Sequence, residues 1–355
     1  FLILKELNCI FENHFFDIIL LSLTLVGVCG GAYYYYSDFS DQDVKTKETV
    51  QTVSGKSGES ETVKEGYVLR DLYFIDENGY VVPRSLALPE SNAVVKQSLE
   101  YLVQNGPVTE LLPNGFKAPL PADTEISVDL KEDGLLVINL SDAFKNYAAV
   151  DEQRILQSIV WTATQFDKVK EVKLQMSGYD LTAMPVGNTP LATSLDRSIG
   201  INHQTSEIAD FMNSKSAVIY YVSQIGNETY YVPVTKRISS NEQNMAAAIV
   251  NELVLGPSYE TDLLSDFHED VVLLNEPEFE NGQVTVNFNQ NIFSDAQNHV
   301  VSQYMLDALV LSLTEQPDID SVALLVEGEA IAVDGNGEKI NKPVTRPQNT
   351  NVGSY

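Results

Sequence analysis

The segments Tyr101-Leu-Val-Gln-Asn-Gly-Pro107 and Asn251-Glu-Leu-Val-Leu-Gly-Pro257 occupy matching places in the chain, 150 residues apart. Each follows apolar residues at helical spacing. We therefore expect its glycine to end a helix in the left-handed conformation and its proline to prevent the helix from continuing. The same offset separates Pro83, in a Tyr-Val-Val-Pro run, from Pro233, in a Tyr-Tyr-Val-Pro run. The offset of 150 residues is the same at both places, which indicates a duplicated domain. Solenoid repeats have much shorter periods, of about 20–50 residues.

Each copy is expected to fold in the order β-β-α-β-β-α-β. Alternating apolar residues predict an opening hairpin, at 67–76 and 80–88 in one copy and at 217–224 and 228–238 in the other. Because proline cannot donate to a strand ladder, the second hairpin strand is expected at an edge or a bulge. A mixed sheet with two helices on one face would bury both helical stripes, so the expected class is α+β. The remaining strands are predicted at 125–130, 135–140 and 171–176, and at 271–274, 283–288 and 321–326.

Further matched residues mark the repeat. Asparagines stand at equivalent strand positions, where such a side chain more often satisfies backbone groups than binds a ligand. A glycine follows each closing strand. Each copy ends with an arginine that is followed five positions later by an asparagine, Arg197 with Asn202 and Arg346 with Asn351, and we call this pair the coda. The coda is expected to tie each tail to its own domain or, alternatively, to meet a neighbour. The repeat-defining structural residues are therefore Gly106, Pro107, Gly256, Pro257, Asn139, Asn287, Gly178, Gly328, Arg197, Asn202, Arg346 and Asn351.

The composition excludes several classes of protein. The 355-residue chain carries 50 acidic and 22 basic residues, a net charge of −28. Such a charge favours solubility and repels polyanions, so nucleic acid is not an expected partner. Cys9 and Cys29 are the two cysteines, and both lie near the N-terminus. The repeats therefore cannot contain a disulfide framework, a cysteine zinc site or a cysteine nucleophile.

The N-terminal region has the features of an export signal or a membrane anchor. Residues 18–28 are uncharged and largely apolar, and both a signal-peptide core and a membrane span fit such a run. Cys29 follows directly, as in a bacterial lipobox, and is the lipidation candidate; the alternative is an uncleaved span with an aromatic belt at residues 33–36. We assign residues 1–36 to the signal or anchor, 37–66 to a disordered polar tether, 67–184 to the first domain, 185–215 to a linker and 216–351 to the second domain.

No motif in the sequence is typical of an active site or a metal site. The four histidines, His14, His203, His268 and His299, lack metal-ligand spacing, and no Gly-x-Ser-x-Gly motif is present. Asp334 begins a stretch that imitates a calcium loop, but lysine occupies the sixth position, where that loop needs glycine. We therefore expect no catalytic residue, no metal and no cofactor.

Two tandem α/β units with the Gly-Pro pairs, the strand asparagines, the closing glycines, the Arg-to-Asn coda and a lipobox-like cysteine resemble the GerM family. The resemblance covers residues 67–351; Ser198 replaces the proline that usually follows the coda arginine. It implies a fold like that of the ring-building domains of the channel between mother cell and forespore. It also implies a non-enzymatic protein at the extracytoplasmic face of the membrane of a Gram-positive bacterium. The resemblance implies that such a protein supports sporulation and germination through contacts with envelope proteins or, as a homo-oligomer, with copies of itself.

Two other functions are compatible with the sequence. A binding module for a cell-wall polymer or a small ligand would use exposed aromatic residues, and Tyr220, Tyr221, Tyr230 and Tyr231 are candidates for stacking on sugars. Half of each alternating strand must face inward, so some of these tyrosines are expected in the core and the others outside. A hydrolase of the envelope would use paired carboxylates that meet only in space. The function we expect is that of a structural assembly protein, with these two as its alternatives.

Overall fold

The computed structural model describes residues 66–204, 213–239, 244–347 and 349–351. Both repeats belong to one compact unit, Val53–Tyr355. The predicted anchor with Cys29 and nearly all of the predicted tether lie outside the described residues. Among the helices that the structure does describe, none has the length and apolar character needed to cross a membrane.

The first repeat begins with a hairpin and ends with a short antiparallel strand. Its elements are β1 (Tyr67–Asp76), β2 (Val81–Pro89), α2 (Val94–Glu100), β3 (Phe116–Lys117), β4 (Ile126–Leu130), β5 (Leu135–Leu140), α3 (Glu152–Ala163), β6 (Glu171–Met176) and β7 (Tyr179–Asp180). Single turns of 3₁₀ helix occur at Asp142–Lys145, Ala149–Asp151 and Arg197–Ile199.

The second repeat follows the same order with one additional strand pair. Its elements are β8 (Ser214–Ile225), β9 (Glu228–Ser239), α4 (Met245–Leu255), β10 (Glu278–Glu280), β11 (Gln283–Phe288), β12 (Phe293–Asp295), β13 (Val300–Val301), α5 (Gln303–Leu313), β14 (Ser321–Val326) and β15 (Val344–Thr345), with a 3₁₀ turn at Gln290–Ile292. The predicted order β-β-α-β-β-α-β therefore describes the main elements of both copies.

Each repeat contains a mixed sheet. In the first repeat the strand order is β4-β5-β6-β7, in which β5 and β6 are parallel and the outer pairs are antiparallel. The second repeat has the same pattern in the order β10-β11-β14-β15. Parallel neighbours need a long crossover, and α3 and α5 provide it. The predicted α+β class with a mixed sheet is confirmed.

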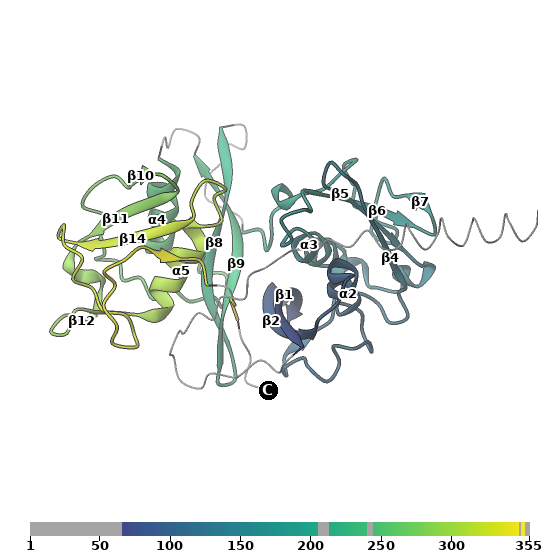
Figure 1. Cartoon of the computed structure of the whole chain (residues 1–355), viewed down its shortest axis with the longest axis horizontal. Coiled ribbons are helices and arrows are strands. Elements are labelled where there is room, and N and C mark those ends of the chain that lie inside the picture. Colours follow the sequence, from purple (N-terminus) through teal and green to yellow (C-terminus); the bar gives the residue numbers. More distant parts are fainter. Residues whose placement is uncertain (1–65, 205–212, 240–243, 348, 352–355) are drawn as a thin grey trace, which may run out of the picture. The chain divides into compact units, whose positions relative to one another are not determined.

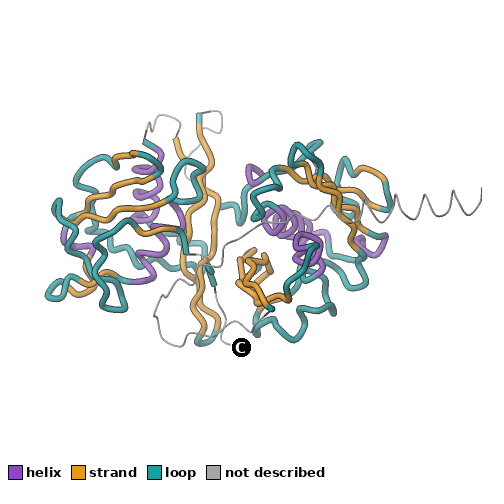
Figure 2. Tube along the Cα trace, in the orientation of Figure 1, coloured by secondary structure: helices purple, strands orange, loops and turns teal. Residues whose placement is uncertain are grey.

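The opening hairpins form a separate layer that the sequence did not predict. The sheets β2-β1-β3 and β8-β9 are distinct from the mixed sheets, and in Figure 1 α4 and α5 lie between the β11–β14 sheet and the β8–β9 hairpin. Figure 2 shows the helices of the first repeat enclosed in the same way. Every residue of α3 from Ile155 to Ala163 is buried, polar residues such as Ser158 and Thr162 included. A helix that is buried on nearly all sides needs a covering layer on two faces, and the hairpin provides the second one.

The helices also fasten the hairpins through matched hydroxyl groups. Thr162 on α3 accepts a hydrogen bond from the backbone N–H of Tyr73 at 3.1 Å, and Ser312 on α5 accepts one from Tyr220 at 2.8 Å. These bonds satisfy backbone donors that β1 and β8 would otherwise leave unpaired and buried. An equivalent hydrogen bond, from a hairpin N–H to a helix hydroxyl, therefore joins the hairpin to the long helix in both repeats.

The predicted helix stop is correct at Gly256 and wrong at Gly106. Gly256 caps α4 with φ +78°, in the left-handed region. In the first repeat α2 ends at Glu100, and Asn105, with φ +57°, adopts the left-handed conformation in place of Gly106. Asparagine tolerates this conformation because its short polar side chain hydrogen-bonds locally. Gly106 is instead required by space, since a Cβ there would lie 2.9 Å from the carbonyl oxygen of Val103.

One predicted strand of the second repeat is displaced. Residues 271–274 form no regular strand; an isolated bridge joins Leu273 to Phe288, and the strand that pairs with β11 is β10, at Glu278–Glu280. Pro277 lies between the two segments and has no N–H to donate, so a continuous ladder along β11 is interrupted there.

The described part of the predicted linker packs on the first repeat. Leu195 exchanges backbone hydrogen bonds with Val172 of β6, at 2.7 and 2.8 Å. The carboxylate of Glu152 accepts hydrogen bonds from the backbone N–H groups of Val186, Gly187 and Thr189. Residues 185–204, the described part of the segment that we assigned to a linker, therefore pack as an ordered part of the first repeat.

Candidate functional site: the outer sheet face and the repeat junction

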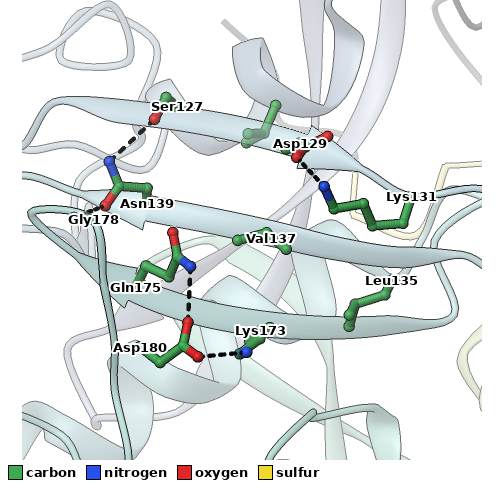
Figure 3. Close-up of a pocket in the computed structure, with 11 residues that line it drawn as sticks. Ser127, Asp129, Lys131, Leu135, Val137, Asn139, Lys173, Gln175, Gly178 and Asp180 are labelled. Atoms are coloured by element: carbon green, nitrogen blue, oxygen red, sulfur yellow. Dashed lines mark hydrogen bonds and ion pairs between the residues drawn. The ribbon is translucent and has the colours of Figure 1, made fainter.

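The outer face of the β4–β7 sheet is a shallow polar groove of about 540 Å³ (Figure 3). Burial alternates along β5, so Leu136, Ile138 and Leu140 enter the core while Val137 and Asn139 face outward. The groove is lined by Ser127, Val128, Asp129, Lys131, Leu135, Val137, Asn139, Lys173, Gln175, Gly178 and Asp180.

The charged groups of this groove pair with one another. Lys173 lies 2.6 Å from Asp180, and the amide of Gln175 donates to the same carboxylate at 2.8 Å. The hydrogen bond from Lys173, followed by that from Gln175, lowers the pKa of Asp180. Lys131 pairs with Asp129 across the other side of the groove, as Figure 3 shows. Asp129, Lys131 and Asp180 are exposed, Lys173 and Gln175 are half-buried, and all of them are paired within the groove. The groove therefore suits polar recognition better than proton transfer.

The strand asparagine and the closing glycine meet in each repeat. The side-chain oxygen of Asn139 accepts a hydrogen bond from the backbone N–H of Gly178 at 2.7 Å (Figure 3), and Asn287 accepts one from Gly328 at 2.9 Å. The asparagine thus satisfies a neighbouring backbone group, which is the role predicted for it. No ligand role is needed to explain its presence at this position.

Both glycines have a conformational reason. Gly178 and Gly328 have φ values of +85° and +84°, and each follows a residue of positive φ. Two successive positive φ angles are typical of the type I′ turn, in which glycine is strongly preferred. A Cβ on either glycine would meet no atom within 4 Å, so backbone conformation and not space selects glycine here.

The coda asparagines lie between the second hairpin strands of the two repeats. Asn202 accepts a hydrogen bond from the N–H of Val81 at 2.7 Å and donates to the carbonyls of Val81 and Pro233, at 2.7 and 2.8 Å. Asn351 accepts from Tyr231 at 2.7 Å and donates to the carbonyls of Tyr231 and Pro83, at 2.9 and 2.7 Å. Each asparagine therefore joins β2 to β9 through its side-chain amide.

The prolines explain why an amide is needed at this junction. β2 and β9 are edge strands, as predicted. Pro83 and Pro233 have no N–H, so the two edges cannot form a continuous ladder with each other. The side-chain amides of Asn202 and Asn351 supply the N–H donors that the two prolines lack, and they donate to the carbonyls of Pro233 and Pro83. We call these two asparagines, with their hydrogen bonds to β2 and β9, the amide clamps.

The coda arginines bind the ends of the long helices. Arg197 donates to the hydroxyl of Thr164, after α3, and Arg346 donates to that of Thr314, after α5, both at 3.1 Å. Both guanidinium groups also pair with Glu315, whose side chain is 7% exposed. The codas thus combine the two predicted alternatives. Each arginine binds the end of the long helix in its own repeat. The other repeat is reached by Arg197, through Glu315, and by both amide clamps.

Further contacts cross the junction beside the clamps. Arg84, which is 1% exposed, pairs with Glu228, and its guanidinium lies 4.8 Å from the ring centroid of Phe116. The hydroxyl of Tyr230 donates to the carboxylate of Asp76 at 2.8 Å, and burial raises the pKa of that carboxyl. The junction is therefore a packed and hydrogen-bonded interface within one chain.

The tyrosines that were candidates for stacking on sugars are core residues, so that part of the alternative is wrong. Tyr220, Tyr221, Tyr230 and Tyr231 are between 0% and 9% exposed. β8 and β9 contain runs of consecutive buried residues, because both faces of this hairpin are covered. The alternating side chains of these strands are therefore buried whichever face they point to. Within the described residues no cluster of three or more His, Cys, Asp and Glu side chains could hold a metal ion.

Comparisons with known proteins agree with this architecture. A family model described as "Germane: Sporulation and spore germination" matches residues 71–182 and 218–332. The chain is 43% identical over 356 residues to the spore germination protein GerM of Bacillus subtilis (strain 168), which covers 95% of this chain and 96% of that protein. The solved structure of the tandem GerMN domains of GerM from Bacillus subtilis matches with a TM-score of 0.76 and 48% identity, over 80% of this chain and 99% of that one. The chain therefore belongs to the GerM family of sporulation and spore germination proteins and contains two tandem GerMN domains.

Proposed function

We propose that this protein is a non-enzymatic assembly protein of sporulation or germination. In this proposal it is anchored at the extracytoplasmic face of the membrane and contacts envelope proteins through the outer face of its first mixed sheet. The relative named spore germination protein GerM supports the pathway, since it is 43% identical over nearly the whole of both chains. The structural observation that carries the proposal is the polar groove on β4–β7, with its mutually paired charges.

The nature of the groove favours a protein partner. Non-obligate protein interfaces have polar rims and many hydrogen bonds, and they tolerate water. The groove offers the amides of Asn139 and Gln175, the hydroxyl of Ser127 and both signs of charge. A complementary surface can therefore exchange its ion pairs without leaving a buried charge unpaired. The amide clamps support the same role, because they hold both repeats in one unit that presents this face.

The test uses Bacillus subtilis cells that lack GerM and produce this chain in its place. The unchanged chain is expected to restore spore formation and germination. Ser127→Arg places a long cation on the exposed floor of the groove and is expected to reduce the rescue at least tenfold at normal protein level. Ser294→Arg, on β12 of the second repeat, is the matched control and is expected to preserve it. Equal rescue by both variants would contradict the groove as the contact surface.

The anchor is tested separately. The chain is expected in the membrane fraction and to be degraded by protease added outside the cytoplasm. Incorporation of labelled fatty acid distinguishes the two predicted anchors, because a lipoprotein takes up the label at Cys29 and loses it in Cys29→Ser, whereas a membrane span carries no label in either form. A chain found only in the cytoplasm would refute extracytoplasmic placement.

The non-enzymatic part of the proposal has its own measurement. Incubation of the purified soluble repeats with peptidoglycan is expected to release no soluble fragments, as judged by chromatography. Sedimentation with the same polymer is expected to leave the protein in the supernatant. Fragment release would establish a hydrolase, and co-sedimentation would establish a wall-binding module.

A further inference from the structure

A second cavity, of about 330 Å³, lies at the junction and differs chemically from the groove. β1 contributes Arg70 and Asp71 to its wall, Gln165 follows α3, and the two coda arginines complete it. Arg197 belongs to the first repeat and Arg346 to the second, so the cavity is built from both. We call it the junction pocket.

The junction pocket is positively charged in a strongly acidic chain. Among the described residues that line it, three carry guanidinium groups and one, Asp71, carries a carboxyl group; Glu315 pairs with the two coda arginines from outside the lining. Burial raises the pKa of Asp71, although hydrogen bonds from Ser85 and Thr350 oppose this effect. With both carboxylates ionised the site still carries an excess of one positive charge. The net charge of the whole chain is −28, so the positive charge of this pocket is opposite in sign to that of the protein as a whole.

Several guanidinium donors of the pocket have no partner among the described residues. Arg197 uses Nε and Nη1, toward Thr164 and Glu315, which leaves Nη2. Arg346 uses Nη1 and Nη2, which leaves Nε. Arg70 lies 5.9 Å from the ring centroid of Phe166 and has no ion pair in the described structure. These donors come from three side chains that surround one cavity.

The arginines of the junction pocket are fixed by the surrounding structure, and none of the functions considered above uses them. Arg197 and Arg346 are held in place by the helix ends and by Glu315, so their remaining donors are pre-oriented, which lowers the entropic cost of binding. Guanidinium groups match carboxylates through paired N–H···O bonds. The volume is at the lower end of ligand pockets, which begin at about 300 Å³. It therefore accommodates a ligand of about dipeptide size.

We propose that the junction pocket binds a small ligand through its carboxylate, and that the three arginines recognise it. This site goes beyond the proposed assembly role and does not depend on the groove. Because the ligand would touch the codas of both repeats, its binding stabilises the junction by mass action. Gln165 contributes a further acceptor, since its amide nitrogen donates to the carbonyls of Asp71 and Thr162 and its carbonyl oxygen is left for the ligand.

The test is a calorimetric titration of the purified tandem repeats with N-acetyl-alanyl-alanine and with the C-terminal amide of the same dipeptide. The acid is expected to bind and to raise the midpoint of thermal unfolding, and the amide is expected to bind at least tenfold more weakly. N-acetylalanine tests whether any small acid binds or whether a peptide terminus is needed. Binding of N-acetylalanine and failure to bind it both support the proposal, provided that the dipeptide acid binds and its amide binds at least tenfold more weakly. Inorganic phosphate tests whether the site merely attracts anions.

Arg70→Gln is the decisive variant, because Arg70 has no ion pair whose loss would disturb the fold. It is expected to weaken the acid at least tenfold, and Arg70→Lys to restore part of the affinity. Lys96→Gln removes the same charge from an exposed position on α2 that lines neither the groove nor the junction pocket, and it is expected to leave the affinity for the acid unchanged. Equal binding of acid and amide, equal binding of phosphate, no binding at all, or an Arg70→Gln variant with unchanged affinity would each overturn the proposal.

Discussion

Asn202 and Asn351 replace, with one side chain each, the strand pairing that Pro83 and Pro233 prevent. Every polar atom of the Asn351 amide has a partner within 2.9 Å, and the residue is 5% exposed. Hydrogen bonds in such a buried position contribute more through the penalty of breaking them than through their net strength. At the residue scale, therefore, the repeated polar residues serve the backbone.

Asn351→Ala is expected to lower the free energy of unfolding by about 3 kcal/mol, because the carbonyls of Pro83 and Tyr231 and the N–H of Tyr231 lose their partner. The measurement is urea denaturation followed by fluorescence. Asn139→Ala is the matched control; it removes a half-buried amide and is expected to cost about 1 kcal/mol or less. Similar losses for the two variants would mean that the clamp contributes nothing beyond an ordinary hydrogen bond.

Gly178→Ala is expected to destabilise the protein by about 1–2 kcal/mol through backbone strain alone, since φ is +85° and the added methyl group meets no atom. Gly178→Asn should cost less, because asparagine tolerates positive φ. Thermal unfolding of the two variants gives the comparison. An asparagine variant that is less stable than the alanine variant would argue against a conformational cause.

At the scale of single elements, the beginning of α3 organises the loop that follows β7. Glu152 is 2% exposed and accepts hydrogen bonds from the loop residues Val186, Gly187 and Thr189 and from the hydroxyl of Tyr147. Burial by itself would raise the pKa of Glu152, but these hydrogen bonds outweigh it and lower the pKa from 4.5 to about 2. One carboxylate thus converts a polar segment into part of the first repeat.

This carboxylate predicts a pH dependence with a definite sign. Its pKa is lower in the folded state, so its stabilisation is complete above about pH 4.5 and is lost as the pH falls toward about 2. Glu152→Gln is expected to be less stable than the unchanged protein by about 2 kcal/mol at pH 7, and the difference should shrink below pH 4.5. Urea denaturation at several pH values measures it, with the exposed Glu171→Gln as control. A difference that is constant with pH would refute this assignment.

At the scale of the whole described chain, the two repeats are coupled through the junction. The amide clamps, the pair of Arg84 with Glu228 and the hydrogen bond from Tyr230 to Asp76 all join one repeat to the other. Val82 of the first repeat also packs in the core cluster of the second. Repeats that share buried contacts are expected to unfold together.

Calorimetry of the tandem repeats is therefore expected to show one cooperative transition. Glu228→Gln should lower its midpoint, with a loss of about 2 kcal/mol, because it leaves the buried guanidinium of Arg84 without a counter-charge. Combining it with Arg84→Met should recover part of that loss, since the unpaired charge is then absent. Two separate transitions in the unchanged protein, or a double variant less stable than Glu228→Gln alone, would contradict this coupling.

The duplication, the order of the elements, the edge position of the proline strands and the backbone role of the strand asparagines all followed from local patterns. Hydrophobic periodicity and turn residues report the conformation of a short segment and which of its sides is buried. They do not report what covers that side, which is why the hairpin layer, the displaced strand β10 and the burial of Tyr220 and Tyr221 became apparent only in three dimensions.

The coda shows the same division most clearly. Its residues and spacing were evident in the sequence, but Asn351 contacts Pro83, which is 268 positions away, and the arginines of both codas meet at Glu315. A pairing over such a distance is set by how two complete repeats pack, and no pattern within either copy encodes it. The junction pocket exists for that reason, since it requires side chains from both repeats to be assembled around one cavity.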